Sequence, residues 1–224
     1  MNIFANFIGE LVQVTMSGNL VISGILIDTG SNIVVIYDGE DFLYIPLIHV
    51  HYINFNCEND TGEISKPDED PIGNQEDSIS LRNTLNNAKG VFTEIFVTSN
   101  QSIHGYVTNV MNDYFVFFSP VHKTLYVPLQ HLKWLKPYKQ SHRPYSLDNE
   151  ELPLIPTSTP LSRTFEEQCK RNIGKAAVFD LGKDPNKIGK LIKIENGQIE
   201  LVLARNQTIY TNLQHVKTLH FPSL

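Results

Sequence analysis

Two histidines stand two positions apart at His49 and His51. On a β-strand, side chains at that spacing face the same way, as a pair of metal ligands would. The surrounding stretch recurs twice in the chain, and Lys133 and Lys217 replace the second histidine there. We therefore expect no metal site and no cofactor. One histidine does recur, and we expect it to tie the end of a strand to the following backbone: His49, His131 and His215.

A second candidate is Asp28, which lies in the sequence Leu-Ile-Asp-Thr-Gly-Ser and is similar to the active-site motif of aspartic proteases. That chemistry needs two carboxylates that share a proton. The recurring stretches have Asn109 and Lys193 at the equivalent position, so a second aspartate would have to come from another chain. Asp, Thr, Gly, Ser and Asn are also typical of hairpin turns. The sequence favours a turn here. An aspartic protease therefore ranks third among the three functions that we consider for this chain, after a structural protein and a nucleic-acid-binding protein.

These stretches belong to a pattern that occurs three times along the 224 residues. In each copy a second glycine follows the first after fifteen positions, and a tyrosine later precedes the recurrent histidine by five. The tyrosines are Tyr44, Tyr126 and Tyr210, and the second glycines are Gly24, Gly105 and Gly189. A repeated pattern predicts a repeated structural unit.

Each copy predicts one short helix followed by five short strands. The helical segments are residues 3–8, 81–89 and 162–172, and Thr164 and Glu167 have the spacing of a capping box. After them come short β-branched and aromatic runs separated by turn residues. Five strands of about 50 residues can enclose a core by curling into a small barrel, and a sharply bent strand needs a residue without Cβ. We therefore predict a mostly β protein with three tandem barrels, bent at Gly24, Gly105 and Gly189.

The segments between the copies differ from them in composition. Residues 56–80 hold eight of the 24 acidic residues and one of the 18 basic residues, so the rest of the chain is close to neutral. We predict barrels at 1–56, 81–138 and 161–224, an acidic disordered linker at 57–80 and a Pro-rich linker at 139–160. No apolar run approaches the ~20 residues of a membrane span. Cys57 and Cys169 have no metal-binding or disulfide spacing.

A helix followed by a bent five-stranded barrel is the outline of Sm-like proteins, which also resemble SH3 barrels. In the Hfq-type members strand four carries Tyr-Lys-His-Ala-Ile, which residues 44–48, Tyr-Ile-Pro-Leu-Ile, partly resemble. The basic Lys-His pair is replaced by Ile45-Pro46, Val127-Pro128 and Thr211-Asn212. Because this charge is missing, we treat nucleic-acid binding as the alternative function of the chain and not as its first predicted function.

A closer resemblance involves Tyr-Thr-Asn-Leu-Gln-His-Val-Lys at residues 210–217 and Lys-Ile-Gly-Lys-Leu at 187–191. They resemble the repeats of the spore coat protein B family of Bacillus, in which Lys-Gly-x-Leu precedes Tyr-x-x-Leu-x-His-Val-Lys. The resemblance implies a non-enzymatic structural component of the endospore coat, made in the cytoplasm of the mother cell and deposited on the coat. Its expected partners are other coat proteins or further copies of itself, joined through strand edges, and not a membrane or nucleic acid.

Overall fold

The computed structural model describes residues 3–55, 64–67, 70–72, 79–98, 101–139, 144–146 and 160–222. Within these ranges the protein is mostly β, as the sequence predicts, with fifteen strands and two α-helices. All pairings between the strands are antiparallel. None of the helices in these ranges is long and apolar enough to cross a membrane.

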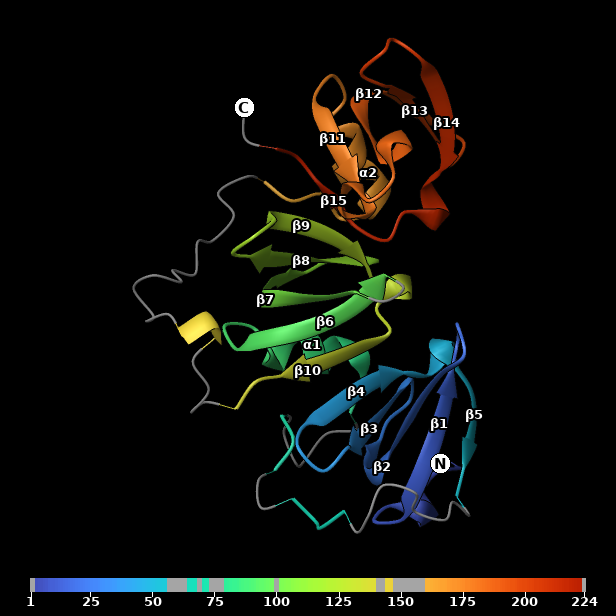
Figure 1. Cartoon of the computed structure of the whole chain (residues 1–224), viewed down its shortest axis with the longest axis vertical. Coiled ribbons are helices and arrows are strands. Elements are labelled where there is room, and N and C mark those ends of the chain that lie inside the picture. The colour runs from blue at the N-terminus through green and yellow to red at the C-terminus, as the bar shows by residue number, and fades with distance from the viewer. Residues whose placement is uncertain are drawn as a thin grey trace.

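The strands fall into three groups of five, which we call units one, two and three. Unit one contains β1 (Leu11–Met16), β2 (Leu20–Thr29), β3 (Ile33–Tyr37), β4 (Phe42–Pro46) and β5 (Val50–Asn54). Unit two contains β6 (Phe92–Thr98), β7 (Gln101–Val110), β8 (Tyr114–Ser119), β9 (Lys123–Pro128) and β10 (Trp134–Pro137). Unit three contains β11 (Ala176–Phe179), β12 (Ile188–Glu195), β13 (Gln198–Val202), β14 (Thr208–Asn212) and β15 (Leu219–His220). The units follow one another along the long axis of the molecule (Figure 1).

Helical segments open each unit and connect its strands. Unit two begins with α1 (Leu81–Asn87) and unit three with α2 (Phe165–Lys170). Ser80 and Thr164 cap these helices by accepting hydrogen bonds from the Asn83 and Glu167 amides. Single 3-10 turns complete the units: η1 (Ala5–Phe7), η2 (Leu47–His49), η3 (Leu129–His131), η4 (Pro144–Ser146), η5 (Asp180–Gly182), η6 (Pro185–Lys187) and η7 (Leu213–His215).

Unit one lacks the helix that the sequence predicts for residues 3–8. Only the 3-10 turn η1 forms there, and its N-cap residue Phe4 makes no side-chain capping hydrogen bond. An uncapped segment this short cannot offset the cost of helix nucleation. The Phe7 ring instead stacks on Phe55, with ring centroids 4.0 Å apart.

The strand order is the same in every unit. The first four strands form a meander, and the fifth returns to pair with the first, which gives the order β4-β3-β2-β1-β5 in unit one. The fourth strand does not pair with the fifth strand of its own unit, so the pairings do not close any unit on itself. They instead join the units into one open sheet of fifteen strands, in which β10 pairs with β4 and β15 pairs with β9.

Most of the two predicted linkers, 57–80 and 139–160, lies outside the described residues, as does Cys57. The predicted disorder and extension of these segments are therefore untested. Of the parts that are described, Ile72 and Ile79 pack against the core of unit two. Cys169 is a free cysteine buried in unit three, where desolvation raises the pKa of its thiol.

Candidate functional site

The recurrent tyrosines lie where one unit meets the next. At the first joint, between units one and two, Tyr44 on β4 stands opposite Leu135 on β10. At the second joint, between units two and three, Tyr126 on β9 stands opposite Leu219 on β15. The same repeat positions therefore meet at both joints. Strand edges of neighbouring units thus pair with each other within the chain.

The apolar core of each later unit includes side chains from the unit before it. Ile33, Val35 and Tyr44 of unit one belong to the same buried cluster as Leu81 and Leu85 of α1. In the second joint the equivalent residues of unit two join Phe165 and Cys169 of α2: Tyr114, Val116 and Tyr126. The outward side of β3 and β4 thus serves as part of the next unit's core.

At each joint a side chain of the preceding unit accepts a hydrogen bond from the first turn of the following helix. The Asn32 side-chain oxygen accepts a hydrogen bond from the Leu81 amide at 3.0 Å. At the equivalent position of unit two, an Asp113 carboxylate oxygen accepts from the Phe165 amide at 2.8 Å. These first-turn amides have no partner within their helices, so a side chain of the preceding unit satisfies them. This contact is not predicted from the sequence, although a polar residue recurs eight positions after the second glycine in both units, as Asn32 and Asp113.

The outward side of unit three has the same geometry but different residues. Gly197, Gln198 and Glu200 stand where the earlier units have Asn32 or Asp113 and two apolar residues. Tyr210 is 69% exposed there, whereas Tyr44 and Tyr126 are 0% and 5% exposed. Unit three therefore lacks the apolar side chains and the helix-orienting side chain that form the two internal joints.

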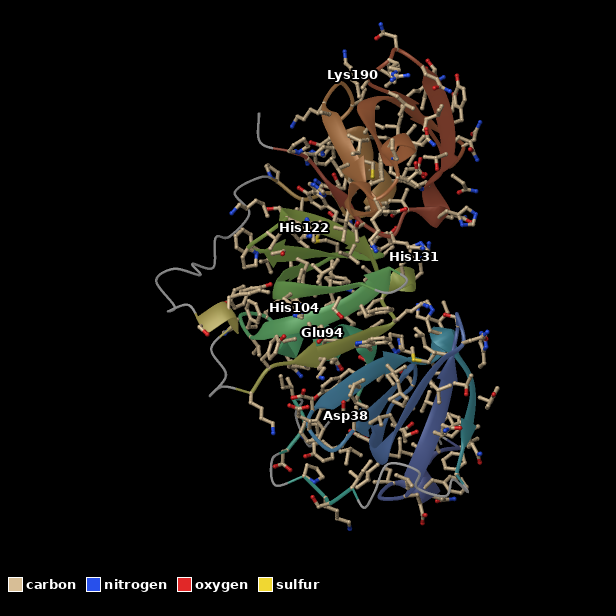
Figure 2. The ribbon with its side chains drawn as sticks, viewed as in Figure 1. Asp38, Glu94, His104, His122, His131 and Lys190 are labelled. Atoms are coloured by element: carbon tan, nitrogen blue, oxygen red, sulfur yellow. The ribbon has the colours of Figure 1, made fainter. Side chains whose placement is uncertain are left out.

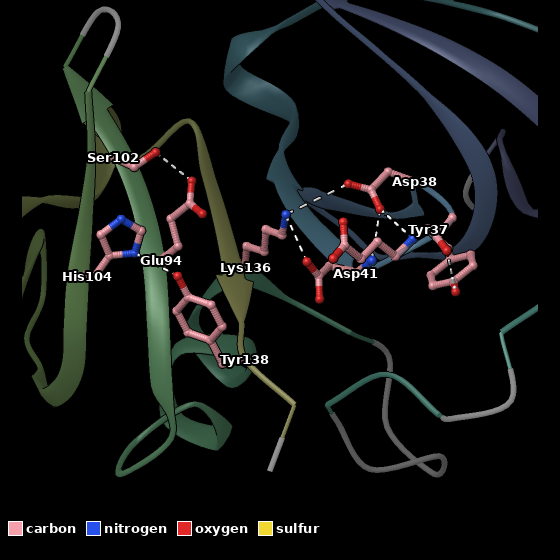
Figure 3. A network of polar contacts seen from close by, with 10 residues as sticks. Tyr37, Asp38, Asp41, Glu94, Ser102, His104, Lys136 and Tyr138 are labelled. Carbon is pink, nitrogen blue, oxygen red and sulfur yellow. Dashed lines mark hydrogen bonds and ion pairs between the residues drawn. The ribbon is translucent and has the colours of Figure 1, made fainter. Parts of the chain in front are cut away.

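The first joint carries an ion pair at its outer edge (Figure 3). Lys136 on β10 places its Nζ 2.9 Å from Asp41 and 3.9 Å from Asp38, in the turn between β3 and β4. Burial opposes the charge of Lys136, but the two carboxylates raise its pKa overall. Next to it on unit two, Ser102 donates to Glu94 at 2.5 Å and the Tyr138 hydroxyl lies 3.0 Å from His104 Nδ1.

At the outer edge of the second joint, histidines replace the ion pair of the first joint. His220 on β15 occupies the repeat position of Lys136, and its ring centroid lies 6.0 Å from that of His122, which precedes β9. His220 Nδ1 is buried without a hydrogen-bond partner in the described part of the chain. The two joints therefore share their backbone pairing and differ in the charged groups beside it.

The recurrent histidines lie in 3-10 turns after the fourth strands, and two of them face the next unit. His131 Nε2 lies 2.7 Å from the Gln214 carbonyl of unit three. Burial lowers the pKa of His131, and the Lys217 ammonium adds to this, although the Gln214 carbonyl favours the charged ring. His131 therefore contacts the neighbouring unit, where the sequence analysis expected a contact with the backbone that follows it.

His49 has the equivalent place at the first joint. Its Nδ1 lies 3.4 Å from Ser17 Oγ, and its Nε2 is buried without a hydrogen-bond partner among the described residues. Burial and the nearby Lys133 ammonium lower its pKa. His51 lies on β5 and is exposed, while His49 belongs to η2, so the two are not neighbours on one strand as a metal pair requires. His215 in η7 of unit three is exposed.

The second glycines of the repeat sit where the backbone of the third strand passes close by. A Cβ on Gly24 or Gly105 would overlap the carbonyl oxygen of Tyr37 or Phe118, and one on Gly189 would lie 2.7 Å from the Val202 oxygen. Real Cβ atoms do not approach a carbonyl this closely, so these positions require glycine. The close contact between neighbouring strands thus explains the spacing of the glycines.

Asp28 is not in the predicted turn. It lies near the end of β2 at an irregularity in the pairing with β3, and its Oδ1 accepts a hydrogen bond from the Thr29 amide at 2.7 Å. Asn109 and Lys193 occupy the same irregularity in β7 and β12. Among the described residues no group of three or more His, Cys, Asp or Glu side chains is arranged to hold a metal ion.

Comparison with known proteins places this arrangement in a family. The protein YwrJ of Bacillus subtilis (strain 168) is 46% identical to the chain over 219 residues, which cover 96% of the chain and 97% of YwrJ. The chain belongs to the YwrJ family. A family model described as the YwrJ third domain matches residues 164–219, a range that starts at the cap of α2 and ends in β15. Unit three therefore corresponds to the third domain of the YwrJ family.

Proposed function

We propose that the chain is a non-enzymatic structural protein, a scaffold of three Sm-like or SH3-like barrels that acts as an assembly component of the bacterial endospore coat. The observation that carries this proposal is the continuous sheet of fifteen strands, in which the units are joined by the same strand pairing twice. Successive units that share both strands and core form a stiff array. A stiff array is what a layered assembly needs.

The strand order of each unit supports the barrel interpretation. A four-stranded meander whose fifth strand returns beside the first brings all five strands around one buried cluster. The glycines at the closest strand contacts permit the strong curvature of a small barrel. In units two and three the side left open by the strands is covered by the helix and by the preceding unit.

The two end strands of the sheet support the proposed assembly role. The fifteen-stranded sheet ends at β5 on unit one and at β14 on unit three. Gln198 and Glu200 make the outward side of unit three polar, which resembles the polar terminal repeats of other repeat proteins. Partner coat proteins, or a second copy, would meet the scaffold at these two end strands, where backbone groups are left to pair.

A localisation experiment tests the proposed place of action. We expect a fluorescent fusion of the full chain to appear in the mother cell only during sporulation and to form a ring around the developing spore. A diffuse signal in growing cells would contradict the proposal. An RNA that co-purifies with the chain, and dissociates steeply as salt is raised, would instead support the nucleic-acid alternative.

A further inference from the structure

We propose that the second joint is an acid-sensitive hinge, which loosens unit three from unit two under mildly acidic conditions more than unit two is loosened from unit one. The sites of proton uptake are His122 and His131 of unit two and His220 of unit three. Figure 2 places His122 and His131 at the two ends of β9, the strand that forms the joint. Proton uptake would therefore add positive charge at both ends of the strand through which units two and three pair.

His122 and His220 form the first of two histidine sites in the proposed hinge. Their ring centroids are 6.0 Å apart across the joint, and both side chains are partly buried. If both rings were protonated, two like charges would face one another at a partly buried contact. The unpartnered Nδ1 of His220 has no acceptor among the described residues to stabilise an added proton.

His131 forms the second part, at the other end of β9. Its Nε2 holds the Gln214 carbonyl of unit three at 2.7 Å. A protonated ring keeps this hydrogen bond but brings a positive charge toward Lys217 and His215, both of which already act against it. Protonation here thus adds repulsion between the units without breaking the contact that positions them.

Asp180 opposes this effect, because its carboxylate favours the charged form of the His131 ring. Asp180 accepts hydrogen bonds from the Lys217 and Thr218 amides at 2.7 and 3.3 Å, and its second oxygen lies 3.2 Å from Lys187 Nζ. Lys123 Nζ donates to the Pro120 carbonyl in its own turn. Other ionisable groups on the elements packed against the joint include Asp113, Tyr114, Tyr126, Glu166, Glu167, Cys169, Lys170 and Arg171.

The sign of the pH effect follows from the direction of the pKa shifts. Burial lowers the pKa of all three histidines, and the neighbouring His122 and Lys217 add to this at His220 and His131 respectively. The detached or unfolded state therefore binds these protons at a higher pH, near the ordinary histidine value of ~6.5. The stability of the joint is complete above that pH and declines as the pH falls through it toward the lowered values.

The first joint provides the internal contrast. The position of His220 is taken there by Lys136, which is paired with Asp41 and Asp38. Histidine is the side chain whose ordinary titration falls between pH 5 and 8. Lys136, whose pKa the neighbouring carboxylates raise, keeps its charge over the range that titrates the second joint. His49 is the counterpart of His131 at the first joint, with Lys133 in the place of Lys217, and burial and this lysine lower its pKa as well. The contrast between the joints therefore comes from the His122–His220 pair, which has no counterpart at the first joint.

Hydrogen exchange of the full chain at pH 7.5 and 5.5 tests the proposal, with protection corrected for the intrinsic pH dependence of exchange. We expect protection of β9 and β15 amides to fall about tenfold more than that of β4 and β10 amides, since each proton taken up changes the opening equilibrium by up to about tenfold per pH unit. Equal protection at both pH values, or equal loss at both joints, would overturn the proposal.

Two sets of variants assign the effect to the histidines. H122N/H220N should remove a large part of the acid-dependent loss at β15, and H122E/H220K should remove it by importing the ion-pair chemistry of the first joint. The matched control is H51N, because His51 is an exposed histidine on the distant strand β5. If both double variants fold at pH 7.5 and keep the full acid-dependent loss, or if H51N abolishes it, the hinge assignment is wrong.

Discussion

The two joints of this protein show which parts of a repeat contact are set by architecture and which are free to vary. Both use a fifth strand on a fourth strand, a buried tyrosine and a side-chain acceptor for the first helical amide. They differ in the outer pair, which is Lys136 with Asp41 in one and His220 with His122 in the other. The shared parts lie in the sheet and core, where a change creates clashes or cavities. The variable pair lies at the partly exposed edge, where several chemistries fit.

The strongest perturbation should come from unit two, because it takes part in both joints. Gly105→Val places a branched side chain against the Phe118 carbonyl, and we expect it to cost several kcal/mol, about 3 or more, and to lower Tm by about 6 °C or more. Thermal unfolding monitored by circular dichroism measures this. Gly189→Val is the comparison, since it should weaken unit three and the second joint while protection in β4 and β10 stays unchanged. An unchanged Tm for Gly105→Val would show that the close strand contact does not constrain the fold.

Removing a joint tyrosine should cost less than this clash but more than any edge contact. Tyr126→Ala leaves a cavity in the second joint, and we expect a loss of about 3 kcal/mol in urea unfolding. Tyr210→Ala is the control at the same repeat position, where the exposed ring contributes less than about 0.5 kcal/mol. Similar losses for the two variants would mean that unit three is also covered by a partner in solution.

The helix-orienting acceptors should have an intermediate effect. Asp113→Ala leaves the Phe165 amide without its partner and is expected to cost about 1 kcal/mol, whereas Asp113→Asn keeps the acceptor oxygen and most of the stability. Asn32→Ala should cost a similar amount at the first joint. Urea unfolding of the three variants tests this, and a loss for Asp113→Asn equal to that of Asp113→Ala would show that charge, and not the hydrogen bond, is what matters.

The ion pair of the first joint should have a smaller effect. Lys136→Met removes a partly exposed pair and is expected to cost about 0.5–1 kcal/mol, with the same loss at pH 7.5 and 5.5. Chemical unfolding at the two pH values measures this. A loss that appears at one pH and vanishes at the other would remove the contrast between the joints.

Asp28→Asn should have the smallest effect of all. The amide oxygen can accept from the Thr29 amide as the carboxylate does, so we expect a change below about 0.5 kcal/mol and no loss of any activity of the chain. Assays of urea unfolding and of pepstatin-sensitive proteolysis check both statements. Proteolysis that disappears in the Asn variant would restore the protease hypothesis.

Much of the local structure could be predicted from the sequence because it depends on local rules. Alternating apolar residues predicted the strands, and Thr164 with Glu167 predicted the start of α2. The spaced glycines predicted bends that need a residue without Cβ, and the structure shows that a Cβ there would clash with the neighbouring strand. The failures were also local in origin. The helix predicted at residues 3–8 lacks a cap and stays a single 3-10 turn, and Asp28 lies in β2 because the strand continues through an irregular pairing to Thr29.

By itself the sequence determined that this protein is a triplicated, mostly β chain, because the periods of apolar, glycine, tyrosine and histidine positions are written along it. Only the tertiary structure decided that the units share one open sheet, that Tyr44 and Tyr126 are buried while Tyr210 is exposed, and that His220 meets His122. These facts depend on contacts between residues roughly 80 to 100 positions apart. Such contacts are selected by the packing of whole units, and no local pattern in one repeat specifies which surface of the next it will meet.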